Sequence, residues 1–103
     1  MFDAPPHQAD AYETVHSFYR PVAAHAVQDL LGVSSASIEI SELRRSIPPQ
    51  PGDWATCARA WKSGQLVYVS VFFRGRAVFT TRRSIVIDRC EHEQFSAFVS
   101  NPL

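Results

Sequence analysis

The chain has 103 residues, of which 46% are hydrophobic and 12% aromatic, and its acidic and basic side chains balance to a net charge of zero. This length predicts a single domain over residues 1–103, and the composition is typical of a folded globular protein and excludes a disordered one. No apolar run is long enough to span a membrane, and the first ten residues lack the basic start and apolar stretch of a signal peptide. We therefore expect a cytoplasmic protein that does not bind membranes.

Two cysteines, Cys57 and Cys90, occur in the chain. Disulfides are rare in the cytoplasm, and no signal peptide is visible. We therefore expect both cysteines to be free thiols.

Charge is distributed unevenly along the chain. Residues 1–53 carry seven acidic side chains and three arginines, whereas residues 54–87 carry six basic side chains and no acid. The remaining residues, 88–103, carry three acids and one arginine. The pattern predicts two oppositely charged surfaces, which favour electrostatic steering of a partner.

The N-terminal third is predicted to be helical. Residues 1–8 contain Pro5 and Pro6 and are expected to form a loose leader. Between residues 9 and 31 the apolar positions recur in steps of three and four, which predicts an amphipathic helix. Pro21 predicts a kink, or a break with Pro21 as the first residue of a second helix, and Gly32 predicts the C-terminal stop. The apolar positions are Tyr12, Val15, Tyr19, Val22, Ala26, Val27 and Leu30.

A strand and a loop are predicted next. Residues 36–43 alternate, with Ile38 and Ile40 on one face, which predicts a half-buried strand at the edge of a sheet. Residues 46–53 contain three prolines and a glycine and are expected to form a loop.

The clearest pattern is a three-stranded antiparallel meander. Residues 54–61, 66–73 and 77–87 are rich in β-branched and aromatic side chains, and glycine-containing turns at 62–65 and 74–76 separate them. A two-residue turn at Ser63-Gly64 predicts a register with two distinct faces. The core face pairs Ala60 with Val67, Ala58 with Val69, Thr56 with Val71 and Trp54 with Phe73. The second face pairs Trp61 with Leu66, Arg59 with Tyr68 and Cys57 with Ser70.

A C-terminal helix is predicted to follow the meander. Asp88 and Glu91 have the spacing of a capping box, Phe95, Phe98 and Val99 form an apolar edge, and Asn101-Pro102 is expected to end the helix. The predicted fold is therefore α+β. It comprises an N-terminal helix kinked or broken at Pro21, a four-stranded antiparallel sheet that includes the meander, and a C-terminal helix.

The second face of the meander is too apolar to be left in water, which indicates an interaction surface. The leading hypothesis is a small non-enzymatic protein that binds another protein as an inhibitor, adaptor or regulator, and one version of it is an inhibitor encoded by a phage or mobile element. A homodimer through the sheet is part of this hypothesis. The predicted partner-binding residues are Arg59, Trp61, Leu66, Tyr68 and Phe72.

The main alternative is a nucleic-acid-binding module, because aromatic side chains on a sheet can stack on bases while arginines neutralise phosphates. The residues predicted for this role are Arg74, Arg76, Arg82 and Arg83.

A second alternative is a thiol-dependent enzyme that uses Cys57 or Cys90. No histidine partner for either thiol is evident, so no catalytic residue is predicted. The sequence Cys90-Glu91-His92-Glu93 lacks the spacing of metal ligands, so no metal and no cofactor are predicted.

Overall fold

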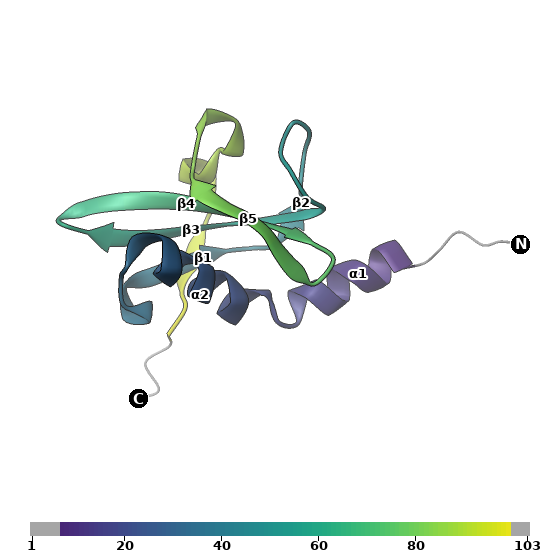
Figure 1. Ribbon diagram of the computed structural model, residues 1–103, viewed down its shortest axis with the longest axis horizontal. Coiled ribbons are helices and arrows are strands. Elements are labelled where there is room, and N and C mark those ends of the chain that lie inside the picture. Colours follow the sequence, from purple (N-terminus) through teal and green to yellow (C-terminus); the bar gives the residue numbers. More distant parts are fainter. Residues whose placement is uncertain (1–6, 100–103) are drawn as a thin grey trace, which may run out of the picture.

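The computed structural model describes residues 7–99 and has α+β architecture. Two helices lie on one side of an antiparallel sheet, and two loops project from the other side (Figure 1). The sheet has six strands in the order β5-β4-β3-β1-β6, and β2 pairs with β3 beside this path. The helices are α1 (His7–His16) and α2 (Tyr19–Leu31). The strands are β1 (Ile38–Ser41), β2 (Arg44–Arg45), β3 (Trp54–Lys62), β4 (Gln65–Arg74), β5 (Ala77–Arg83) and β6 (Phe95–Ala97). Short 3-10 turns are η1 (Ser35–Ser37), η2 (Val86–Asp88) and η3 (Cys90–His92).

The helical segment is divided in two, but not at Pro21. The chain leaves the helix at Ser17 and Phe18, and α2 begins at Tyr19. Pro21 therefore lies in the first turn of α2, where a missing backbone N–H costs little because that turn has no intrahelical acceptor for it. The predicted kink or break at Pro21 is not confirmed. The predicted stop at Gly32 is confirmed, since this residue has a φ of 71° and its N–H donates to the Gln28 carbonyl.

The leader predicted for residues 1–8 lies outside the described residues except for its last two, which belong to α1.

The meander is confirmed with its register. Every predicted β3–β4 pair is present, from Trp54 with Phe73 to Trp61 with Leu66. Ser63 and Gly64 both have positive φ, at 53° and 79°, which is the conformation of a tight two-residue hairpin turn. The third strand is shorter than predicted, ending at Arg83 instead of residue 87.

The predicted core face of the meander packs under the helices. Apolar side chains from α1, α2 and the sheet form one buried cluster. Its members from β3 and β4 are Trp54, Ala58, Ala60, Val69, Val71 and Phe73. Small residues on β3 beside larger ones on β4 leave room for α2, as the pattern predicted.

The sheet has six strands instead of the predicted four. Strand β1, expected at an edge, lies between β3 and β6. The two strands that the sequence pattern does not reveal are β2 and β6, which contain two and three residues, too few to show an alternation. Arg20 of α2 helps to hold β6 in place, because its guanidinium donates to the carbonyls of Ser96 and Ala97 at 3.2 and 3.1 Å.

The predicted C-terminal helix is wrong over the described residues. In its place the chain forms η2, η3 and β6. Asp88 is not the N-cap of a long helix. It is the last residue of η2 and is buried, and its carboxylate accepts hydrogen bonds from the Ile85 N–H before that turn and from side chains of the sheet. Arg89 has a φ of 56°, a left-handed conformation that ends the turn there. The predicted end at Asn101-Pro102 lies outside the described residues.

The prediction of two free thiols is also wrong, because Cys57 and Cys90 form a disulfide. Cys57 lies on the second face of β3 and Cys90 in η3, and the sequence separation is 33 residues. The two cysteines meet because η3 lies across the sheet. The predicted long helix does not include this arrangement.

Candidate functional site

The predicted partner-binding residues share the second face of the sheet but differ in accessibility. Phe72 is completely buried and therefore cannot contact a partner. Arg59 and Tyr68 pack against Phe95 from β6, with the Arg59 guanidinium 4.6 Å and the Tyr68 ring 5.9 Å from the Phe95 ring centre. Arg59 also forms an ion pair with Glu39.

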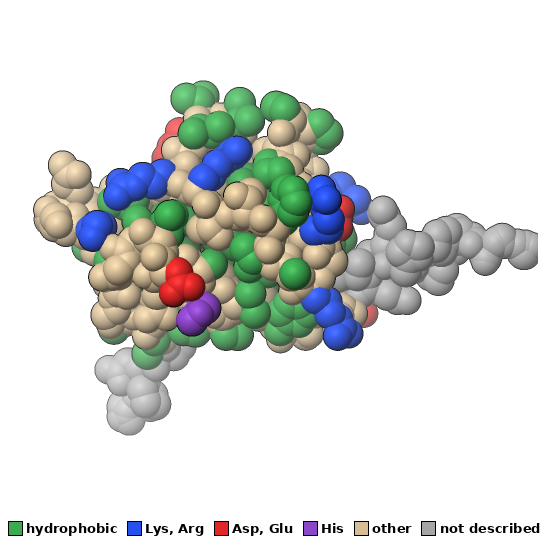
Figure 2. Space-filling view, viewed as in Figure 1, with side chains coloured by type: hydrophobic (Ala, Val, Ile, Leu, Met, Phe, Trp, Pro, Cys, Tyr) green, Lys and Arg blue, Asp and Glu red, His purple; other side chains and the backbone are tan. Residues whose placement is uncertain are grey.

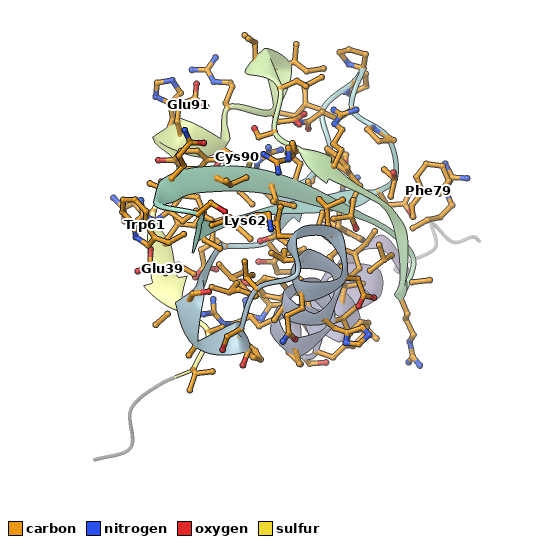
Figure 3. The ribbon with its side chains drawn as sticks, turned by 60° about the vertical axis from the view of Figure 1, so that its left-hand side comes forward. Glu39, Trp61, Lys62, Phe79, Cys90 and Glu91 are labelled. Atoms are coloured by element: carbon orange, nitrogen blue, oxygen red, sulfur yellow. A yellow bond between two sulfur atoms is a disulfide. The ribbon has the colours of Figure 1, made fainter. Side chains whose placement is uncertain are left out.

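Trp61 and Leu66 are the exposed members of this set. Trp61 is 60% exposed near the end of β3, and its side chain lies at the outer edge of the molecule (Figure 3). The structure therefore leaves only the end of the predicted surface open to a partner.

The arginines predicted to bind nucleic acid are divided among different environments. Arg74 and Arg76 are exposed at the β4–β5 turn, where the Arg74 guanidinium lies 4.1 Å from the ring centre of Phe79. Arg82 instead pairs with buried Asp88 at 2.7 Å. Arg83 follows Arg82 along β5 and so points to the opposite face. The four side chains do not form one continuous basic surface.

The centre of the second face is covered by two segments that project together from the sheet. The first is loop 46–53, between β2 and β3, and the second is segment 84–93, which contains η2 and η3. Their ends carry four apolar side chains that we call the apolar tip: Ile47, Ile85, Val86 and Ile87, exposed by 64%, 47%, 85% and 44%. Figure 2 shows hydrophobic side chains gathered on both projections.

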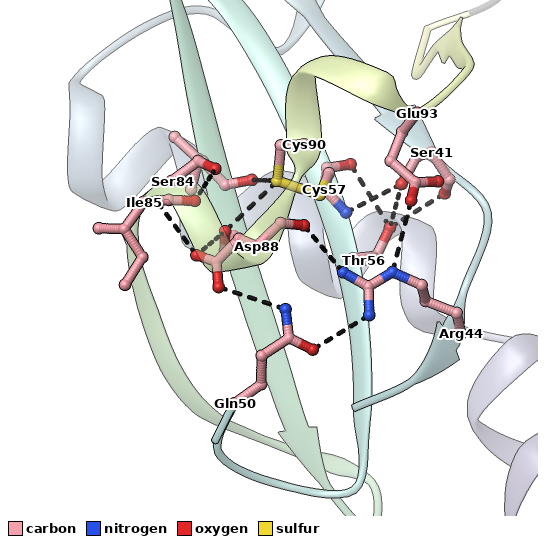
Figure 4. The surroundings of a disulfide bond; sticks show 12 residues. Ser41, Arg44, Gln50, Thr56, Cys57, Ser84, Ile85, Asp88, Cys90 and Glu93 are labelled. Atoms are coloured by element: carbon pink, nitrogen blue, oxygen red, sulfur yellow. Dashed lines mark hydrogen bonds and ion pairs between the residues drawn. A yellow bond between two sulfur atoms is a disulfide. The ribbon is translucent and has the colours of Figure 1, made fainter. Parts of the chain in front are cut away.

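Asp88 anchors segment 84–93 beneath the apolar tip. Its carboxylate accepts hydrogen bonds from Ser70 Oγ at 2.6 Å, Arg82 Nη2 at 2.7 Å and the Ile85 backbone N–H at 3.2 Å. The adjacent Cys57–Cys90 disulfide ties the same segment to β3 (Figure 4). The segment is therefore attached to the sheet at two neighbouring points.

The electrostatics of Asp88 are dominated by two opposing effects. Burial by itself would raise the pKa of this carboxyl, but the hydrogen bonds from Arg82, Ser70, the Ile85 N–H and Gln50 outweigh burial and lower the pKa below the ordinary value. Asp88 is therefore ionised at neutral pH, and its charge is compensated by Arg82.

Gln50 joins the two projecting segments to each other. Its side-chain oxygen accepts from the Ile47 N–H at 2.9 Å and from Arg44 Nη1 at 3.1 Å, and its side-chain nitrogen donates to Asp88 Oδ1 at 3.2 Å. Arg44 adds a bond from Nη2 to the Asp88 carbonyl at 3.1 Å and an ion pair with Glu93 at 3.4 Å. Loop 46–53 and segment 84–93 thus share one polar network, drawn in Figure 4.

The base of loop 46–53 is closed by backbone contacts. The Ser46 N–H donates to the Asp53 carbonyl at 3.0 Å, and the Asp53 N–H donates to the Phe73 carbonyl at 2.7 Å. Gly52 has a φ of 76°, and a Cβ at this position would lie 2.7 Å from the Phe73 carbonyl oxygen. Only glycine fits here without a shift of the backbone.

Two hollows on the surface are candidates for a ligand. One is a cleft of about 610 Å³ between loop 46–53 and segment 84–93, whose walls include Ile47, Pro48, Pro49, Val86 and Ile87. The other is an open groove of about 660 Å³ between α2 and β5, lined mainly by apolar side chains such as Val22, Leu30 and Val78. The two hollows differ in the sign of the charge in their walls: the lining of the cleft includes Arg44 and Arg89, whereas the lining of the groove includes Asp29.

The described part of the chain lacks the groups that metal binding and thiol chemistry require. Among the described side chains, those of residues 12–99, no group of three or more His, Cys, Asp or Glu could hold a metal ion. Both cysteines are in the disulfide, so neither offers a thiolate in this state. No helix of the described residues is long and apolar enough to cross a membrane.

The apolar tip and the network below it were not predicted from the sequence. Ile85, Val86 and Ile87 continue the pattern of β5, which predicts a longer strand, and Ile47 lies in the proline-containing segment 46–53, which predicts a loop. One available signal is an aliphatic residue, Ile47, in a segment with three prolines, because such loops are usually polar. The run Ile85-Val86-Ile87 between Ser84 and Asp88 is a second signal.

Comparisons with protein-family models, with curated proteins and with solved structures found no match for this chain.

Proposed function

We propose that the chain is a small non-enzymatic binding protein that acts as an inhibitor, adaptor or regulator of another protein, and that the apolar tip is the surface that binds. The observation that carries the proposal is the exposure of Ile47 and Val86 on two segments that a buried polar network holds together. Exposed apolar groups on a single-domain protein mark interaction sites when they are contiguous.

The energetics of the site support this proposal. Burying the ionised Asp88 carboxylate costs free energy unless every acceptor finds a donor, and here Ser70, Arg82 and Gln50 supply donors. The same arrangement leaves Ile47 and Val86 exposed to water by 64% and 85%. A rigid apolar surface loses little conformational entropy on binding, so the arrangement favours affinity for a partner.

The position of the surface differs from the one expected on the sheet. Phe72 is buried, and Arg59 and Tyr68 contact Phe95 within the same chain, so these residues are not part of the proposed surface. Trp61 and Leu66 remain exposed as a cross-strand pair, and we assign the proposed self-association to this end of the sheet.

The disulfide favours a particular cellular compartment for the protein. Structural disulfides persist in oxidising compartments and are rare in the cytoplasm. We therefore propose an oxidising compartment in place of the cytoplasm that the sequence predicts. Trapping free thiols with an alkylating mass tag in intact cells tests this, and the expected result is protein without added tags. Two tags per chain would restore the cytoplasmic assignment.

The binding proposal is tested by site-specific photo-crosslinking. A photoreactive amino acid is placed at Val86, and the matched control carries it at Leu30, which is exposed on α2 beside the groove. In cells that make the protein naturally, we expect a protein adduct from position 86 and not from position 30. Equal adducts from both positions, or adducts from position 30 alone, would contradict the proposal.

The captured partner is then purified and its affinity measured. We expect the double substitution Ile47→Asp with Val86→Asp to weaken binding about tenfold or more, because two charges replace side chains that become buried. The control Leu30→Asp is expected to leave the affinity unchanged. An unchanged affinity for the double variant would show that the apolar tip is not the binding surface.

A further inference from the structure

Arg89 is a charged side chain of the cleft that has no ion-pair partner among the described residues. Arg44 is paired with Glu93 at 3.4 Å, whereas no ion pair or hydrogen bond of the Arg89 guanidinium occurs within the described part of the chain. Arg89 is exposed beside the apolar tip. An unpaired guanidinium next to aliphatic side chains gives this cleft an excess of positive charge.

The backbone at Arg89 provides a second, independent observation. Its φ of 56° and ψ of 33° are left-handed, a conformation that glycine or asparagine adopts more readily than arginine. Glycine would fit this turn with less strain. A large charged side chain at such a position indicates a use for the side chain itself, since strained conformations cluster at functional sites.

The chemistry of the cleft then specifies its ligand. Val86 and Ile87 from one wall, and Pro48 and Pro49 from the other, suit an aliphatic side chain. Guanidinium groups bind carboxylates through two parallel hydrogen bonds. We propose that the cleft receives an extended segment of the partner protein in which an aliphatic side chain lies beside a carboxylate, and that Arg89 binds this carboxylate. The inference rests on the function proposed above and adds the chemical class of the partner's contact segment.

The carboxylate could belong to an aspartate or glutamate side chain or to the C-terminus of the partner, and a peptide array separates these sources. Four sets of short peptides are compared on the oxidised full chain. The first set contains an aliphatic residue and an internal acidic residue, and its C-terminus is amidated. The second set contains an aliphatic residue and no internal acidic residue, and its C-terminal carboxylate is free. The third has the aliphatic residue and no carboxylate, and the fourth has the acid and no aliphatic residue.

We expect one of the first two sets to bind about tenfold or more tightly than the third and fourth sets. Whichever of them binds identifies the source of the carboxylate. Equal binding of the third set would overturn the proposal, as would the absence of binding by all four sets.

Substitutions at Arg89 test its assigned role. Arg89→Gly removes the charge and relieves the left-handed strain, so folding is retained and can be checked by thermal unfolding. We expect this variant to bind the carboxylate-containing peptides no better than the third set, while Arg89→Lys keeps most of the preference. If Arg89→Gly keeps the full preference, the assignment is wrong.

Failure of this inference is distinguishable from failure of the proposed function. The crosslink from position 86 and the loss of affinity in the tip variant use the natural partner and do not depend on a carboxylate. A positive crosslink with no preference for acidic peptides would reject only the role of Arg89. Loss of both results would reject the apolar tip as a binding site.

Discussion

The two faces of the sheet are both buried at their centres, but different side chains bury them. Under α1 and α2 the contacts are apolar, with Val27, Val71 and Phe73 among the buried residues. Under the two projecting segments the contacts are a disulfide and an ionised Asp88 with its donors. The first face therefore gains stability from area removed from water, and the second from a few specific bonds. Specific bonds hold a small segment in a single position without a large apolar interface, which leaves its apolar side chains exposed.

The largest expected effect is on the helix-covered face. We expect Phe73→Ala to reduce the free energy of unfolding by about 3 to 5 kcal/mol, because it opens a cavity in the main core. Urea denaturation followed by circular dichroism measures this loss. The control Phe79→Ala removes the same side chain from an exposed position on β5 and is expected to have a much smaller effect. Similar losses for both variants would show that the core does not depend on this face.

Removing the disulfide should lower the stability of the domain, because it removes a bond between the second face of the sheet and segment 84–93. For the double variant Cys57→Ala with Cys90→Ala, we expect a loss of about 3 to 4 kcal/mol, from the entropy of a chain that is no longer closed across a separation of 33 residues. Denaturation of this variant in the presence and absence of a reducing agent should give the same curve, whereas reduction should shift the wild-type curve toward it. A wild-type curve that reduction leaves unchanged would contradict the assigned bond.

The Asp88 network predicts a dependence on pH. The pKa of Asp88 is lowered by folding, so its contribution to stability is complete above the ordinary value of 3.8 and is lost as the pH falls through the lower folded value. At pH 7 we expect Asp88→Asn to be less stable than the wild type by about 2 to 3 kcal/mol. The difference should shrink in acid. A difference that is constant between pH 7 and pH 2 would exclude this carboxylate as the source.

A smaller effect on stability distinguishes a steric clash at a glycine from the cost of a positive φ alone. Gly52 and Gly64 have similar φ values of 76° and 79°, but a Cβ would clash with the Phe73 carbonyl only at Gly52. We expect Gly52→Ala to destabilise the domain more than Gly64→Ala by about 1 to 2 kcal/mol. Thermal unfolding of the two variants measures the difference. Equal losses would mean that loop 46–53 can shift away from β4 without cost.

The smallest effect on stability is expected at the apolar tip. Val86 is 85% exposed, so Val86→Asp should change the free energy of unfolding by no more than about 0.5 kcal/mol. Chemical denaturation at neutral pH is sufficient to check this. A loss above 1 kcal/mol would show that the side chain supports the fold, and would weaken its assignment to binding.

The fold could be predicted from the sequence wherever local pattern and tertiary contacts agree. The turn at Ser63-Gly64 sets the register of β3 and β4, and the alternation beside it correctly assigns Val69 and Val71 to the core. The region after β5 could not be predicted, because Asp88 and Cys90 have partners on distant strands. The local capping pattern favours a helix there, but the buried bonds to Ser70 and Cys57 stabilise a different path.

The candidate site was less predictable than the fold. Arg59, Tyr68 and Phe72 were correctly placed on one face, but accessibility on that face depends on Phe95 and on segment 84–93, whose path the sequence pattern does not reveal. The residues of the apolar tip become a group only when loop 46–53 and segment 84–93 lie side by side.

The orientation of the Gln50 amide has a consequence for communication between the two segments. Its oxygen faces Ile47 and Arg44, and its nitrogen faces Asp88, so a rotation of the amide by half a turn would place donors against donors. A movement of loop 46–53 therefore reaches segment 84–93 through one side chain. A partner that displaces the Gln50 side chain from one wall of the cleft would take a hydrogen-bond donor from Oδ1 of Asp88, the residue that anchors the other wall.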